Sequence, residues 1–201
     1  MSQPALKRVT PEEYLALEEQ AEYKSEYFAG KIFAMAGASY EHNSIVMNII
    51  SAAGPKVRDS KCRLHGLDLR LWIEEKDVFT YPDVMIICGE PEFYFDRNDT
   101  VTNPLMIIEV LSESTKNYDR GEKFEMYRAI PTLREYVLID QNRVHVERFV
   151  KTDGGWVLSE WNDAAATLQF VSVDFHMPIS DIYRGIEFPA PQDPEQESAA
   201  E

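Results

Sequence analysis

Two strongly apolar segments of this chain each carry a carboxylate where a strand would normally place a core side chain. The first segment, Tyr81–Ile87, contains Asp83, and the second, Leu105–Ser112, contains Glu109. Burying an unpaired carboxylate costs several kcal/mol even after its surroundings relax. Each carboxylate therefore needs a cation, a hydrogen-bond donor or a metal ion beside it, and the fold has to supply that partner.

The pattern around these segments predicts a mixed α/β or α+β domain in which helices flank a central mixed sheet. Met106–Leu111 is the most apolar strand, so we expect it near the centre with both faces covered. A helix over Lys116–Ala129 and a strand over Glu135–Gln141 then give a β-α-β order. Other expected helices span 10–21, 40–57 and 178–183, with a hairpin over 23–28 and 30–35 and strands over 62–65, 67–73, 78–87, 144–150, 156–161 and 168–173. Alternating polarity predicts that the strand over 67–73 is half-buried.

The length and composition fit one sizeable domain. The chain has 201 residues and 44% hydrophobic content, and we expect a single domain over 1–188 with a flexible acidic tail over 189–201. No apolar run approaches the roughly 18 residues of a membrane span, and the start lacks an apolar signal-peptide core. Cys62 and Cys88 show no CxxC spacing, which favours reduced thiols in a cytoplasmic protein over the alternative of a disulfide.

The net charge of −15 argues against a protein that simply coats DNA, because affinity for phosphates comes largely from Lys and Arg. Four of the acids lie after Phe188. Residues 116–151, by contrast, carry a local excess of two positive charges. That segment gives weak support for a nucleic-acid surface.

Several other chemistries lack their sequence signatures. The chain has no GxxxxGK[ST] loop, no GxGxxG after a strand and no GxSxG elbow. His65, His145 and His176 have no metal-ligand spacing between them, so no zinc site is expected. P-loop nucleotide hydrolysis and serine esterase chemistry are therefore disfavoured.

The two acidic segments and their neighbours resemble the PD-(D/E)XK nuclease superfamily and, within it, the bacterial putative restriction endonuclease family. Pro82-Asp83 matches the PD motif, and Glu109 matches the acid of the next motif. The resemblance covers most of residues 8–175 and also includes Thr10–Leu15, Glu26 with Gly30-Lys31-Ile32, His42 at a helix start, and Glu135–Asp140. It implies a restriction-endonuclease-like core.

One position departs from the superfamily pattern. The lysine of the motif should stand two residues after the glutamate, but Leu111 stands there. In the family that this chain resembles, the lysine looks relocated to the following helix, where Lys123 is the candidate. Its helix face would also carry Asp119 and Tyr127. The alternative is an ordinary surface ion pair between Asp119 and Lys123.

The resemblance implies a metal site and assigns its residues. Asp83, Glu109 and the backbone carbonyl of Val110 would hold Mg²⁺, with Mn²⁺ as a substitute. Hard oxygen ligands suit this ion, which neutralises a phosphate and activates water. Lys123 would steady the attacking water and the developing negative charge, and Glu26 would support the site.

Each assignment has a structural alternative. Asp83 could cap the turn after Pro82, and Glu109 could form a buried ion pair. Glu26 could lie on a solvated strand face. His42 could assist proton transfer, although a structural role at the helix start is favoured. Ser112 and Gln141 are secondary candidates for polar contacts.

The resulting hypothesis is a Mg²⁺-dependent endonuclease that acts on double-stranded DNA and forms a homodimer. Its main rival is a non-catalytic binding or assembly module on the same fold, motivated by the net charge and by Leu111. A third reading is an enzyme that acts on another phosphoester or a nucleotide.

Overall fold

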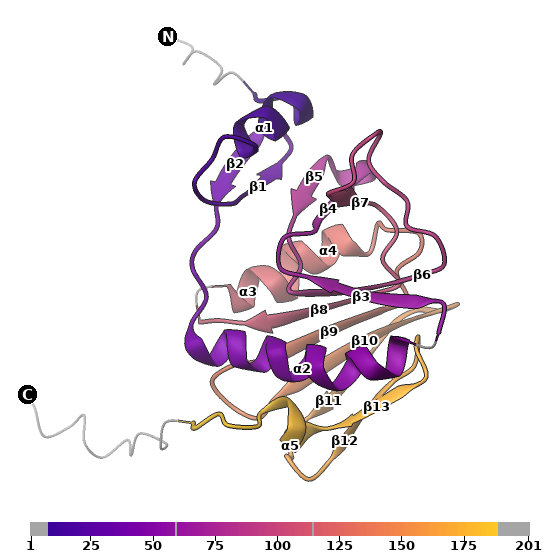
Figure 1. The fold of residues 1–201 in the computed structure, drawn as a ribbon. Coiled ribbons are helices and arrows are strands. Elements are labelled where there is room, and N and C mark those ends of the chain that lie inside the picture. Colours follow the sequence, from indigo (N-terminus) through magenta and orange to yellow (C-terminus); the bar gives the residue numbers. More distant parts are fainter. Residues whose placement is uncertain (1–7, 59, 114, 189–201) are drawn as a thin grey trace, which may run out of the picture.

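A six-stranded sheet forms the centre of the molecule (Figure 1). The structure is a computed structural model that describes residues 8–58, 60–113 and 115–188. The strand order is β11-β10-β9-β8-β6-β3. These strands are β3 (Cys62–Gly66), β6 (Val84–Cys88), β8 (Met106–Leu111), β9 (Glu135–Asp140), β10 (Val146–Thr152) and β11 (Gly155–Trp161).

Strand β8 lies inside this sheet, as its composition predicts. All six of its residues are buried. It runs parallel to β9 and antiparallel to β6. The parallel pair is joined by the helical segment 116–127, because a parallel connection needs a crossover. The predicted mixed α/β fold and its β-α-β order are confirmed.

Helices cover the two faces of the sheet. Helix α2 (Tyr40–Arg58) packs Ile45 and Ile49 against one face, and it continues through Pro55 to one residue beyond the expected end at residue 57. Phe124 and Tyr127 of the helical segment 116–127 pack against the other face. Figure 1 shows α2 on the opposite side of the sheet from α3 (Lys116–Tyr118) and α4 (Phe124–Tyr127). Residues on the two faces of β8 therefore belong to separate cores.

The crossover helix differs from the uninterrupted helix that we expected over 116–129. It consists of α3 (Lys116–Tyr118), a π-helical turn (Asp119–Lys123) and α4 (Phe124–Tyr127). Single π-turns are rare and often occur at functional sites. Here the turn contains both buried charged residues of the segment, Asp119 and Lys123.

A second, five-stranded sheet has the order β2-β1-β5-β4-β7. The single strand expected over 78–87 is in fact two strands, β5 and β6, which lie in different sheets. The break falls at Pro82, which has no N–H to continue a ladder of hydrogen bonds. The strands of this sheet are β1 (Ser25–Phe28), β2 (Lys31–Ala34), β4 (Arg70–Ile73), β5 (Val78–Thr80) and β7 (Thr100–Val101).

Strand β4 also corrects an expectation. A half-buried strand over 67–73 was predicted, but β4 begins at Arg70 and all four of its residues are buried. Leu71 and Ile73 face one core, while Trp72 packs in an aromatic cluster 4.3 Å from the ring of Phe79. Alternation failed as a guide because both faces of the strand are covered.

The smaller elements follow the sequence with shifted ends. Thr10 and Glu13 form a capping box at the start of α1 (Pro11–Glu18), which ends three residues earlier than expected. The hairpin turns at Ala29-Gly30. The remaining elements are η1 (Glu74–Lys76), β12 (Thr167–Phe170), the unpredicted β13 (Phe175–Pro178) and α5 (Ile179–Ile182).

The expected tail over 189–201 lies outside the described residues. Among the described residues, no helix is both long and apolar enough to cross a bilayer.

The expectation of reduced thiols is wrong in this structure. Cys62 and Cys88 form a disulfide, with their Cα atoms 3.9 Å apart. They lie directly opposite each other in the antiparallel pair β3–β6, a register that sequence spacing alone does not reveal. The cysteines therefore give no support to the cytoplasmic expectation.

A charged network holds the loop before β7 to Glu19, the C-cap residue of α1. Arg97 donates two hydrogen bonds of 2.7 Å to Asp99 and another of 2.8 Å to Glu19. The hydrogen bonds from Arg97 are the main reason that the pKa of Asp99 falls to about 2. Asp99 therefore stabilises the folded chain when it is ionised.

This network leads to a prediction about acid stability. Asp99→Asn should lower the free energy of unfolding at pH 7 by about 1 kcal/mol or less, because Asp99 is partly exposed and its ion pairs are screened by solvent. The folded-state pKa is depressed, so the stabilisation is full above about pH 4 and disappears as the pH falls through about 2. Urea unfolding between pH 7 and pH 2 measures it, with the exposed Asp96→Asn as the control. A deficit that persists at pH 2 would contradict the charge-based explanation.

Candidate metal-binding and catalytic site

Asp83 and Glu109 meet across the adjacent strands β6 and β8. The antiparallel register sets Val84 opposite Ile108, which places Asp83 next to Glu109. The Asp83 N–H donates to Glu109 Oε2 at 3.2 Å, and the Val110 N–H donates to Asp83 Oδ2 at 2.7 Å. Val110 thus contacts Asp83 through its amide, and a role for its carbonyl stays a prediction.

Lys123 reaches the same place from the π-helical turn. Its Nζ lies 2.9 Å from Glu109 Oε1 and 3.5 Å from Asp119 Oδ1. Lys123 and Asp119 are both buried, so the alternative of an ordinary surface ion pair is wrong. The π-turn brings both side chains to the face of the sheet that carries Glu109.

Glu26 joins the cluster from β1 of the smaller sheet. Its Oε1 lies 3.6 Å from Lys123 Nζ and accepts a hydrogen bond from the Thr80 hydroxyl. The side chain is only 16% exposed, which contradicts the alternative of a solvated strand face. The four side chains singled out from the sequence, Asp83, Glu109, Lys123 and Glu26, therefore come together.

His42 and Tyr127 also contact the carboxylates, although local sequence pattern favoured neither as a site residue. His42, near the start of α2, places Nε2 3.0 Å from Asp83 Oδ1. Tyr127 donates its hydroxyl to Glu109 Oε1 at 2.7 Å. The only local signal for Tyr127 was its place four residues after Lys123. These contacts fix the orientation of both carboxylates.

The structure shows how Leu111 is accommodated at the position where the superfamily pattern has its lysine. Leu111 points to the same face of β8 as Glu109, because alternate residues of a strand share a face. It is 1% exposed and belongs to the core beneath the helical segment 116–127. An apolar side chain fills the position of the superfamily lysine, while the Lys123 ammonium contacts Glu109 from the helix.

The secondary candidates, Gln141 and Ser112, form hydrogen bonds with other polar residues. Gln141 Oε1 accepts a long hydrogen bond of 3.5 Å from Ser39 Oγ. Ser112 hydrogen-bonds Thr115 in the turn that leads into α3. Both residues lie at the carboxyl ends of the parallel strands β8 and β9, where Gln141 N donates to Leu111 O.

Burial and neighbouring charges shift the pKa values of the cluster. Burial raises the pKa of Glu109 to about 8, an effect that Lys123 opposes and Asp83 reinforces. Burial alone would lower the pKa of Lys123, but the surrounding carboxylates, Glu109 first, hold it well above its usual value. Burial would raise the pKa of Asp83, but hydrogen bonds from His42 and Val110 hold it below its usual value.

Negative charge is in excess at this site. Among the residues that the structure describes, four carboxylates gather around one ammonium group: Glu26, Asp83, Glu109 and Asp119 around Lys123. In surroundings of low dielectric such an excess favours the uptake of a further cation. The adjacent carboxylates supply hard oxygen ligands, which is the donor type that Mg²⁺ prefers. The residues present therefore fit a divalent cation between Asp83 and Glu109.

The site also has an opening to solvent. The side chain of Asp83 is 22% exposed and that of His42 is 15% exposed, while Glu109 is 4% exposed. An ion or a phosphate would therefore approach from the side of Asp83 and His42. Glu109 and Lys123 form the floor.

Comparison with known proteins supports a common family. A family model described as "Putative restriction endonuclease" matches residues 11–180. Two uncharacterized proteins of Synechocystis are similar to the chain. The protein sll1609 is 42% identical over 82% of this chain and 93% of its own length, and slr1290 is 35% identical over 90% and 94%. A crystal structure from Anabaena variabilis, described as a putative nuclease belonging to DUF820, shares the fold with a TM-score of 0.70. It is 21% identical and covers 87% of this chain and 97% of its own.

Proposed function

The chain belongs to the Uma2 family of putative restriction endonucleases, and from that premise we propose that it is a Mg²⁺-dependent endonuclease that hydrolyses phosphodiester bonds of DNA. The observation that carries the proposal is the pair Asp83–Glu109 beside the buried Lys123. Paired carboxylates with a lysine at 2.9 Å are suited to phosphodiester hydrolysis. The fold shared with a nuclease-like neighbour supports the same reading.

Asp83 and Glu109 would hold the metal in this mechanism. When bound, Mg²⁺ neutralises charge on the scissile phosphate and makes a water molecule more acidic. Tyr127 and His42 orient the two carboxylates through the hydrogen bonds at 2.7 Å and 3.0 Å. Such supporting contacts keep ligands in place when the ion binds.

Lys123 would provide the positive charge nearest to the reacting phosphate. Its raised pKa keeps the ammonium protonated at neutral pH, so it donates hydrogen bonds and does not act as a base. Glu26 and Asp119 hold it in place at 3.6 Å and 3.5 Å. The ammonium would therefore steady the attacking water and stabilise negative charge that develops in the transition state.

Double-stranded DNA is the substrate that we propose, with a homodimer as the acting unit. A dimer would bring two sites to the two strands of a duplex. The net charge of −15 makes binding to phosphates depend on local positive charge. The segment 116–151, which contains Lys123, carries the local excess of positive charge.

Metal removal and replacement tests the proposal. The purified chain, treated with EDTA and dialysed, should leave supercoiled plasmid intact, and added Mg²⁺ or Mn²⁺ should restore cutting. Mg²⁺ should also raise the melting temperature, because a ligand that binds the folded state stabilises it. Cutting that persists in EDTA would contradict metal dependence. Absence of both cutting and metal-induced stabilisation would favour the non-catalytic binding module.

A further inference from the structure

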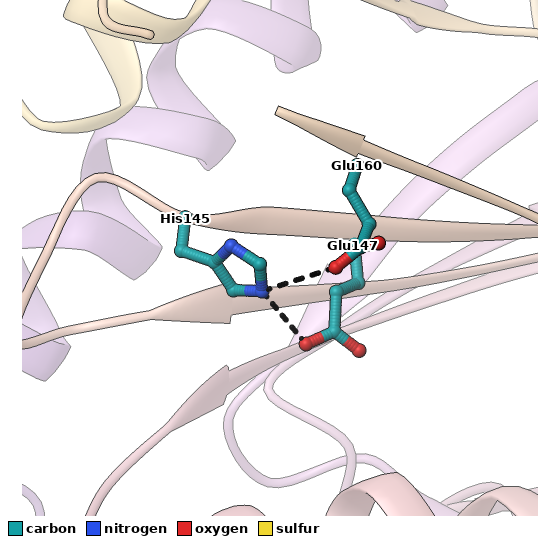
Figure 2. A group of neighbouring side chains, drawn as sticks. All are labelled: His145, Glu147 and Glu160. Carbon is teal, nitrogen blue, oxygen red and sulfur yellow. Dashed lines mark hydrogen bonds and ion pairs between the residues drawn. The ribbon is translucent and has the colours of Figure 1, made fainter. Parts of the chain in front are cut away.

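A second cluster of ligand-type side chains lies at the β10–β11 hairpin, outside the site described above. His145 directly precedes β10, Glu147 lies in β10, and Glu160 lies opposite Glu147 in β11. Figure 2 shows the three side chains pointing toward one another, with His145 Nε2 facing both carboxylates. That nitrogen is 2.9 Å from Glu147 Oε1 and 3.7 Å from Glu160 Oε1.

The other nitrogen of His145 is already engaged. His145 Nδ1 lies 2.5 Å from Asn162 Oδ1, and an amide oxygen can only accept a hydrogen bond. The ring therefore carries its proton on Nδ1 and, when neutral, directs the Nε2 lone pair at two carboxylate oxygens. A cation at Nε2 would relieve the repulsion between this lone pair and the two carboxylate oxygens. Metal-binding histidines show the same geometry, donating their second N–H to an oxygen acceptor.

Burial and charge add to the need for a cation. His145 and Glu147 are each 7% exposed. Arg120 donates to Glu147 Oε1 at 2.6 Å and forms an ion pair with that carboxylate, while Glu160 adds a second carboxylate to the cluster. The Glu160 side chain is 50% exposed and leaves the cluster open to solvent.

We propose that His145, Glu147 and Glu160 bind a transition-metal cation of the Zn²⁺ type. Ligand atoms about 2.1 Å from a tetrahedral Zn²⁺ lie about 3.4 Å from one another, and the two separations from His145 Nε2, 2.9 Å and 3.7 Å, bracket that value. All three ligand atoms lie within 4.8 Å of one another. A mixed set of nitrogen and oxygen donors suits Zn²⁺ better than Mg²⁺, which prefers oxygen alone. Water would complete the coordination.

This site is distinct from the one at Glu109, although both lie on the same face of the sheet. Strand pairing sets Glu109 opposite Leu138, Leu138 opposite Glu147, and Glu147 opposite Glu160. Glu109 and Glu147 are thus two strands apart, which corresponds to about 10 Å. Arg120 links the second cluster to the π-helical turn that carries Lys123. The expectation of no zinc site rested on the spacing of the histidines, whereas this cluster combines one histidine with two glutamates that strand pairing brings together.

The alternative to Zn²⁺ at this place is a proton on His145 Nε2. A titration with Zn²⁺ distinguishes between these two cations. Titration calorimetry in excess Mg²⁺, which saturates an all-oxygen site, should show one Zn²⁺ per chain. Glu160→Gln should weaken Zn²⁺ binding at least tenfold, and this variant should fold because Glu160 is half-exposed. Asp83→Asn should leave Zn²⁺ binding unchanged, as should His176→Ala, which removes an exposed imidazole of β13.

Two outcomes would overturn the proposal. The first is a wild-type chain that binds no Zn²⁺, and the second is a Glu160→Gln variant that binds it as tightly as wild type. The first result would leave a proton as the cation at His145 Nε2, and the second would place the bound Zn²⁺ away from Glu160. Because Asp83→Asn is included, failure here leaves the proposed nuclease site untouched.

Discussion

Asp83→Asn is expected to lower the rate of DNA cleavage by about a thousandfold. A metal ion contributes several kcal/mol of transition-state stabilisation, and each 1.4 kcal/mol corresponds to about tenfold in rate. The substitution keeps the shape of the side chain, and its amide oxygen can still accept the hydrogen bond from Val110 N–H. The loss should therefore appear in activity, with a melting temperature close to that of the wild type.

Single-turnover cleavage of a plasmid in saturating Mg²⁺ measures this effect. The matched control is Asp68→Asn, because Asp68 is a surface carboxylate that is 84% exposed and paired with Lys24. The Mg²⁺-induced rise in melting temperature should shrink in Asp83→Asn and persist in Asp68→Asn. Cutting by Asp83→Asn at the wild-type rate would remove Asp83 from the mechanism.

The parts of the site that could be predicted are those that interrupt a strong local pattern. Glu109 stands out because it is a carboxylate within the most apolar strand, β8, and Asp83 stands out beside Pro82 at the start of β6. Burying a charge is costly, so the sequence alone indicates that each of these two carboxylates needs a partner. Whether they would face each other depended on the register of β6 and β8, which local pattern does not contain.

The parts that could not be predicted depend on contacts between distant segments. His42 reaches Asp83 from a helix that begins 43 residues earlier in the chain, at Tyr40. The π-helical turn has no distinctive local pattern, and it buries Asp119, which looked like a surface residue. Pro82 lies between β5 and β6, but the apolar residues on either side of it suggested one continuous strand.

The charge balance around Lys123 leads to the largest expected effect on stability. Lys123→Met should lower the free energy of unfolding by about 3–5 kcal/mol, because removing one partner of a buried ion pair leaves the other uncompensated. The rate of cleavage should fall by about a hundredfold to a thousandfold, because the negative charge that develops in the transition state loses the Lys123 ammonium as a hydrogen-bond donor. Urea unfolding in EDTA and plasmid cleavage in Mg²⁺ measure the two effects. Lys116→Met, which disrupts a surface pair with Glu113, should cost less than about 0.5 kcal/mol.

A second substitution separates the two roles of Lys123. Adding Glu109→Gln to Lys123→Met removes a buried carboxylate that the first change left unpaired, so much of the lost stability should return while cleavage stays lost. Lowering the pH should also restore part of the stability that Lys123→Met loses. Burial raises the pKa of Glu109 to about 8 with Lys123 opposing the rise, so the folded Lys123→Met chain takes up a proton more readily than the unfolded chain. Its stability deficit should therefore shrink as the pH falls, and a deficit that grew toward acid would show that Lys123 does not stabilise the fold by neutralising these carboxylates.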